Sequence, residues 1–182
     1  NVRLAARMLL QTTLTRMPER VRIRESSTAA AKLHSLMDRS TPEVNAMVLL
    51  LGTIGALFPQ DIAPQTASIV ATRLVAQLFE DVRVGVAAEL IGKGIAIWRP
   101  HIENVSAVTL QLIHRMAVAG NDATPVQRAL IEIAAAEPEH FIATVNSAIL
   151  GTKMQQMLNA ISLVTKERAD VFARYLPQIV TC

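Results

Sequence analysis

The stretch that decides the fold spans residues 88–100 and reads Ala88-Glu89-Leu90-Ile91-Gly92-Lys93-Gly94-Ile95-Ala96-Ile97-Trp98-Arg99-Pro100. Its Gly92-Lys93-Gly94 segment looks like part of a phosphate-binding loop. That motif, however, needs a glycine five positions before the Gly-Lys pair, and a Ser or Thr after the lysine to hold magnesium. Ala87 and Gly94 stand at those two positions, so the sequence does not predict a nucleotide site in this stretch.

The same stretch has the pattern of a helix. Residues 82–90 form an alanine-rich helical pattern, unlike the buried strand that precedes a phosphate loop. We expect one helix over 82–98, in which the small residues Gly92 and Gly94 let a neighbouring helix approach closely. Trp98 is then a structural anchor in the core or at an interface, and Pro100 ends the helix.

Prolines, glycines and capping residues divide the rest of the chain into further helices. Thr41-Pro42-Glu43 combines a capping residue, a proline at the first helical position and an acid in the first turn, which is a typical helix start. Residues 161–165 have the composition of a strand but lie between helical patterns. The remaining predicted helices cover 2–17, 26–37, Pro42 to about Phe58, Pro64 through Leu78, Asn104 to Gly120, a segment starting at Thr124-Pro125, Glu137-Pro138 to Gly151, 153–164 and 166–176.

About nine or ten helices joined by short turns predict an all-α fold. Helices of this length suggest stacked antiparallel pairs, as in a HEAT or armadillo α-solenoid with a right-handed superhelical course. Residues 1–182 would form a single α-helical repeat domain. No repeat of about 40 residues is visible, so a compact helical bundle stays an alternative.

Composition favours a protein of packed helices. Apolar residues make up 51% of the 182 residues and charged residues 18%. The longest apolar run, 46–58, has 13 residues, whereas a membrane-spanning helix needs about 20. We therefore expect a buried helix there and no membrane span. Aromatic residues make up only 3%, which argues against a partner of single-stranded nucleic acid.

Positive charge is concentrated near the start of the sequence. Residues 1–40 contain eight Lys or Arg and three Asp or Glu, whereas residues 41–182 contain ten Lys or Arg and twelve Asp or Glu. Arg20, Arg22 and Arg24 are the candidate partner contacts, suited to an acidic protein surface. A flexible, solvated linker is the simpler interpretation of this triplet. A nucleic-acid surface would need more positive charge.

The sequence offers no constellation of catalytic, cofactor-binding or metal-binding residues. The four histidines, His34, His101, His114 and His140, lack metal-ligand spacing. No nucleophile elbow is present, and the adjacent carboxylates Glu80-Asp81 would point about 100° apart on a helix. Cys182 is the lone cysteine, which favours a reducing compartment. We therefore expect no enzyme activity and no cofactor.

An ordered series of segments resembles the C-terminal α-solenoid region of the rabconnectin beta subunit, in the WD-repeat protein seven family. The family is one of large proteins in which the solenoid follows WD-repeat propellers. The resemblance covers roughly 43–150, and beyond this range it extends only to helical character. The matching segments are 88–94, 98–101 and 104–108, with 46–56 upstream and 128–130, 133–134 and 141–144 downstream.

The resemblance implies a function in protein assembly. In that family the WD-repeat subunit joins a larger rabconnectin-type subunit, and the complex regulates assembly and activity of the vacuolar proton pump (V-ATPase) and hence vesicle acidification. The expected protein is a non-enzymatic scaffold, cytoplasmic and peripheral to vesicle or endosomal membranes. The alternatives are an unrelated HEAT-like adaptor or membrane-traffic scaffold, and a helical regulatory domain attached to an enzyme.

The chain is also expected to be a fragment of a larger WD-repeat protein. It does not begin with Met, and members of the family have longer polar inserts between these helices. Three short junctions, Arg24-Glu25, Gly120-Asn121-Asp122 and Gly151-Thr152, then mark places where disordered loops are missing from the sequence. Neighbours there would not be covalent neighbours in the full protein.

Overall fold

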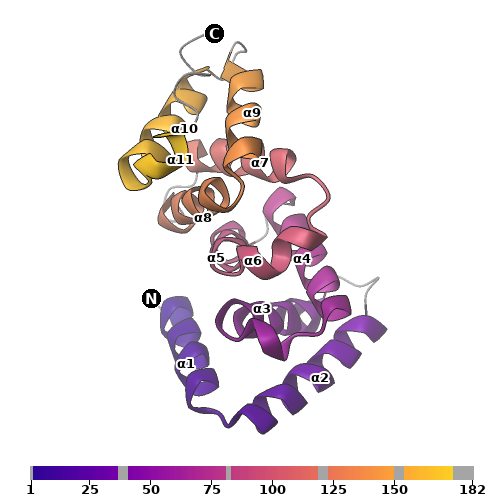
Figure 1. Ribbon diagram of the computed structural model, residues 1–182. Coiled ribbons are helices and arrows are strands. Elements are labelled where there is room, and N and C mark those ends of the chain that lie inside the picture. Colours follow the sequence, from indigo (N-terminus) through magenta and orange to yellow (C-terminus); the bar gives the residue numbers. More distant parts are fainter. Residues whose placement is uncertain (1, 37–40, 81–82, 119–122, 150–153, 174–182) are drawn as a thin grey trace.

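The computed structural model describes residues 2–36, 41–80, 83–118, 123–149 and 154–173, and within them it is all α-helical, with no strand (Figure 1). This confirms the predicted fold class. Nine of the described helices have ten or more residues, and α6 and α11 are single turns. The elements are α1 (Val2–Arg16), α2 (Glu19–Ser35), α3 (Pro42–Leu57), the 3₁₀ turn η1 (Pro59–Asp61), α4 (Pro64–Phe79), α5 (Val84–Lys93), α6 (Ile95–Trp98), the 3₁₀ turn η2 (Arg99–His101), α7 (Val105–Val118), α8 (Ala123–Ala136), α9 (Pro138–Ile149), α10 (Met154–Glu167) and α11 (Ala169–Ala173).

The helices stack in two rows. In one row α3 packs on α5, α5 on α8 and α8 on α10, while in the other α4 contacts α7 and α7 contacts α9. The rows are joined where α4 packs on α3 and α5, α7 on α8 and α9 on α10, while α2 packs on α3. One cluster of buried hydrophobic residues extends through them, from Leu14 on α1 to Phe172 on α11. This arrangement is compatible with an α-solenoid, whose handedness stays a prediction.

The apolar run 46–58 lies mostly in α3. Its inward residues Met47, Val48, Leu51 and Ile54 are buried in the common core. None of the described helices combines the length and the apolar character needed to cross a membrane. The start of α3 is as predicted, because the Thr41 hydroxyl accepts a hydrogen bond from the Val44 N–H at 3.3 Å.

The second helix is longer than the sequence pattern indicated. It begins at Glu19 rather than at Ser26 and runs through Arg24-Glu25, so no junction exists at that point. Its inward face contains Arg22, Ser26 and Leu33. A charged residue in the first inward position interrupts the apolar periodicity, and this is why the pattern failed to predict the first two turns.

The prediction of a single helix over 82–98 is also wrong, because the structure divides this stretch into two helices. The helix ends at Lys93 and restarts at Ile95, with Gly94 between the two segments at φ −107° and ψ 20°. The chain then continues into η2, so Pro100 lies in a 3₁₀ turn and not at the end of a long helix. A glycine inside a helical pattern weakens the helix, and in this protein the chain turns at it.

The remaining boundaries follow the predictions closely. The Asn104 side chain caps α7 by accepting the Ala107 N–H at 2.8 Å. Residues 161–165, which have a strand-like composition, lie within α10. Helix α8 begins at Ala123, so Thr124-Pro125 belong to its first turn. The junctions at 120–122 and 151–152, the end of the predicted helix 166–176, and Cys182 lie outside the described residues.

Candidate functional site

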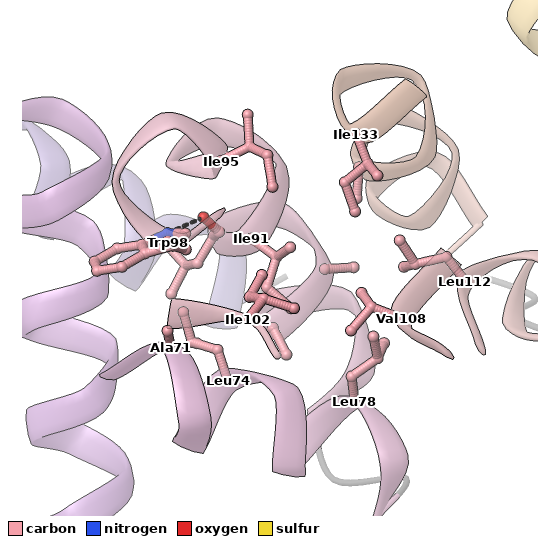
Figure 2. Packing of buried hydrophobic residues seen from close by; sticks show 14 of the residues in the cluster. Ala71, Leu74, Leu78, Ile91, Ile95, Trp98, Ile102, Val108, Leu112 and Ile133 are labelled. Atoms are coloured by element: carbon pink, nitrogen blue, oxygen red, sulfur yellow. Dashed lines mark hydrogen bonds between the residues drawn. The ribbon is translucent and has the colours of Figure 1, made fainter. Parts of the chain in front are cut away.

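Trp98 lies at the meeting point of several helices. Its side chain is fully buried, and its indole Nε1–H donates a hydrogen bond to the Leu90 carbonyl at 2.8 Å (Figure 2). A Cβ added to Gly55 of α3 or to Gly94 would overlap the indole ring. The ring therefore fills the space between α3 and the α5–α6 turn, and this space exists only because both positions are glycine.

Gly92 has a comparable role on the other side of α5. A Cβ built on it would lie 2.8 Å from the Ala129 Cα atom, so the backbones of α5 and α8 are in direct contact. The backbone N–H of Gly94 is not available to a phosphate either, because it donates a hydrogen bond to the Leu90 carbonyl at 3.1 Å. Gly92 is thus a helix-packing residue, and its surroundings leave no room for a phosphate group.

The helical glycines Gly92 and Gly52 should respond differently to replacement by Ala. Gly92→Ala pushes a methyl group against the α8 backbone, and overpacking of this kind costs about 1–3 kcal/mol. The better helix propensity of Ala returns up to about 1 kcal/mol, so we expect a net loss of about 1–2 kcal/mol in urea melts. Gly52→Ala is the control, since the one close neighbour of its Cβ would be the movable end of the Leu90 side chain, at 2.9 Å, with Leu74 at an ordinary contact distance of 3.8 Å.

The outcome for Gly52→Ala should be a change within about 0.5 kcal/mol of the original chain, or a gain in stability. If both variants lost the same amount, the contact between Gly92 and α8 would not be the cause.

Lys93 and Glu89 form part of a network that joins α5 to α1. The Lys93 ammonium donates to Glu89 Oε1 at 2.7 Å, and Glu89 Oε2 forms an ion pair with Arg7 of α1. Burial, followed by the positive charges of Arg7 and Arg128, lowers the pKa of Lys93. Lys93 is therefore engaged by a carboxylate, unlike the lysine of a phosphate loop, which reaches a nucleotide.

For these reasons we expect no saturable binding of ATP or GTP in the micromolar range. Isothermal titration calorimetry with the magnesium nucleotide is a suitable measurement, with Lys93→Ala as the control. Saturable binding that disappears in Lys93→Ala would contradict a packing role for Gly92-Lys93-Gly94.

The three arginines predicted as candidate partner contacts do not share a surface. Arg20 and Arg24 are exposed, and Arg24 pairs with the neighbouring Glu25 at 2.9 Å. Arg22 is buried, its Nε–H donates to Asp61, and its guanidinium lies 3.7 Å from the centre of the Phe58 ring. The triplet is thus helical and not a flexible linker, and Arg22 belongs to an internal contact between α2 and η1. Sequence reasoning missed this because Asp61 is 39 residues away.

The histidines and carboxylates of the described residues show one further cluster. Glu137 forms an ion pair with Arg99 at 2.8 Å, and its Oε2 lies 3.1 Å from His140 Nδ1. This ties η2 to the start of α9. Within the described parts of the chain, no group of three or more His, Cys, Asp or Glu side chains is placed to hold a metal ion.

Several large apolar side chains remain exposed on the outer helices. Met8 and Leu9 on α1 are 60% and 68% exposed, and Met154 and Leu158 on α10 are 54% and 42% exposed. The second pair is separated by four residues and so lies on one side of α10.

Comparison of the chain with protein-family models, with curated proteins and with solved structures finds no match. The resemblance to the rabconnectin beta subunit therefore stays a prediction.

Proposed function

We propose that this chain is a non-enzymatic interaction domain that binds protein partners along its stacked helices. The observation that carries the proposal is the two-row stack, in which an elongated series of helices presents its outer sides to solvent (Figure 1). Helical arrays of this kind use extended surfaces for binding. The exposed apolar pairs on α1 and α10 add contact groups that water solvates poorly.

The resemblance of residues 43–150 to the rabconnectin beta subunit makes this proposal specific. The partners would be the large rabconnectin-type subunit and subunits of the vacuolar proton pump. The function would be regulation of pump assembly and of vesicle acidification, at the cytoplasmic side of vesicle or endosomal membranes. An unrelated HEAT-like adaptor or membrane-traffic scaffold has the same architecture and is the second candidate.

Affinity capture with the native full-length protein tests both levels of the proposal. The tagged protein is recovered from cytosol and from detergent extracts of membranes, and its partners are identified by mass spectrometry. Proton-pump subunits or the large partner subunit would support the specific function, whereas coat or adaptor proteins would support the second candidate. Recovery of the folded protein without any stoichiometric partner from either extract would contradict the scaffold function.

A further inference from the structure

Helix α1 packs on α3 (Figure 1) and contacts the rest of the molecule through one stripe of side chains. The buried and partly buried side chains follow the spacing i, i+3, i+4, i+7 and i+10, and they are Arg7, Leu10, Gln11, Leu14 and Met17. The other side chains from residue 5 to residue 16 are exposed. An amphipathic helix that binds in the groove of a partner protein uses this spacing of anchors. α1 therefore lies on the array in the manner of a docked helix.

The contacts that hold α1 are few for a helix of 15 residues. Among the residues of α1 whose side chains the structure describes, Leu14 alone is fully buried. The hydroxyls of Thr12, Thr13 and Thr15 donate to carbonyls four residues earlier in the same helix, and threonine is a poor helix former. Since packing of an apolar face is the main source of helix stability in proteins, α1 is only weakly held in place.

The ion pair between α1 and α5 can separate without leaving a carboxylate unpaired. Arg7 pairs with Oε2 of Glu89, while Lys93, on the same helix as Glu89, donates to Oε1 at 2.7 Å. Glu89 therefore keeps one cation when α1 leaves. This matters because its side chain is only 20% exposed, and a partly buried carboxylate without a cation would be destabilising. Its Oε2 can then accept the cation of another helix.

Helix α2, in contrast, is fixed to the array. Arg22 pairs with the buried carboxylate of Asp61, and its Nη1–H donates to the Met17 carbonyl at 3.2 Å. Release of α2 would leave Asp61 buried without its cation. The chain is thus held from Met17 onward, and Pro18, which has no N–H to donate, separates the two helices. α1 can leave by a change at residues 16–17 while the other helices stay packed.

Resting on the proposed scaffold function, we infer that the surface of α3 and α5 that α1 covers is a docking site for an amphipathic helix of a protein partner. We call this surface, which includes Glu89, the α1 seat. Helix α3 has no charged residue after Glu43, and a helix that is apolar on most sides has to be covered. The partner helix has an Arg or Lys for Glu89 and large apolar residues three and seven positions later, as α1 has. It replaces α1, which acts as an internal competitor.

A second copy of this chain is a weaker occupant of the α1 seat. Its α1 would form the same contacts as the α1 already in place, and binding would also cost the translational and rotational entropy of association. The chain's own α1 has the advantage of a high effective concentration. A partner helix overcomes this advantage by burying more apolar surface and by having better helix formers than the three threonines of α1.

The test uses a fluorescein-labelled peptide of residues 2–17 with the three threonines replaced by Ala, and binding to the intact chain is measured by fluorescence anisotropy. Leu14→Glu in the chain should release α1 and leave the α1 seat unchanged. We expect it to tighten peptide binding at least about tenfold, because the apparent affinity rises with the fraction of chains whose surface is uncovered. Leu9→Glu is the matched control, since Leu9 is 68% exposed on the same helix. It should bind the peptide like the original chain.

Two further variants locate the peptide and guard against misfolding. In the Leu14→Glu chain, Glu89→Arg should weaken binding about fivefold or more, and replacing Arg7 of the peptide by Glu should restore it. If circular dichroism shows that Leu14→Glu does not fold, Arg7→Gln takes its place in the chain. This variant removes the ion pair with Glu89 and should tighten peptide binding about threefold.

Equal binding by the original chain, Leu9→Glu and the α1-releasing variant would overturn the inference, because α1 would then not compete for the surface. Failure of the exchanged charges to compensate would also overturn it, since the peptide would lie elsewhere. A concentration-dependent dimer of the original chain that the peptide dissociates, measured by light scattering, would assign the α1 seat to a second copy and contradict a partner helix.

The affinity capture with the full-length protein separates this inference from the proposed function. If the original protein and Leu14→Glu recover the same partners in equal amounts, the scaffold function holds and the docking site is wrong. Absence of any stoichiometric partner from both proteins contradicts the scaffold function itself.

Discussion

Replacing Trp98 by Ala should lower the free energy of unfolding by about 3–5 kcal/mol, the range found for removing a buried large aromatic side chain. The indole fills the space between Gly55 of α3 and Gly94, so its loss leaves a cavity that two backbones enclose. Trp98 is the only tryptophan in the chain, and the unfolding should therefore be followed by circular dichroism in urea rather than by fluorescence.

The Trp98→Phe variant separates packing from hydrogen bonding. It keeps an aromatic ring between the glycines and removes the donor to the Leu90 carbonyl, which still accepts the Gly94 N–H. We expect a smaller loss, about 1–2 kcal/mol. A loss below about 1 kcal/mol in Trp98→Ala would be typical of an exposed side chain, and Trp98 would then become a candidate for partner contact.

Arg22→Met should destabilise the chain by about 3–5 kcal/mol, because it leaves the carboxylate of Asp61 buried without its cation. The Asp61 side chain is 1% exposed and that of Arg22 is 8% exposed, so water screens the pair very little. The substitution also removes the guanidinium from the Phe58 ring and from the Met17 carbonyl, to which Arg22 Nη1–H donates at 3.2 Å. Urea denaturation at neutral pH gives the measurement.

Two further variants make this expectation specific. Arg20→Met, two residues away on the exposed side of α2, should change stability by no more than about 0.5 kcal/mol. The double variant Arg22→Met/Asp61→Leu should recover most of the lost stability, since apolar residues of similar volume can replace a buried ion pair at little cost. A loss in Arg22→Met no larger than in Arg20→Met would show that the ion pair contributes nothing to the fold.

Helix positions could be predicted wherever local signals suffice. Thr41 and Asn104 are capping residues whose side chains bind the following N–H groups, and such contacts span only three residues. The start of α2 could not be predicted, because the inward Arg22 is stabilised by a carboxylate in a distant part of the chain. The turn at Gly94 was missed for a different reason, because the apolar pattern runs on through it, although the Trp98 ring that fills the space beside Gly94 lies only four residues along the chain.

The candidate site was less accessible to sequence reasoning than the fold. Arg7 and Lys93 are far apart in the sequence, and their shared pairing with Glu89 exists only in the folded chain. Arg20, Arg22 and Arg24 form a conspicuous triplet in the sequence, but the helical geometry of α2 turns Arg22 inward. Closeness in sequence therefore suggested one basic surface, but of this triplet only Arg20 and Arg24 are exposed.

The arrangement of helices in two rows also determines the order in which parts of the chain unfold locally. When each helix is held mainly by near neighbours, the stability of an array is close to a sum of terms for single helices and for adjacent interfaces. The contact of α5 with α8 lies in the middle, whereas α1 is held by α3 and by the Arg7–Glu89 ion pair. Opening therefore begins at the outer helices, with the centre protected longest from hydrogen exchange.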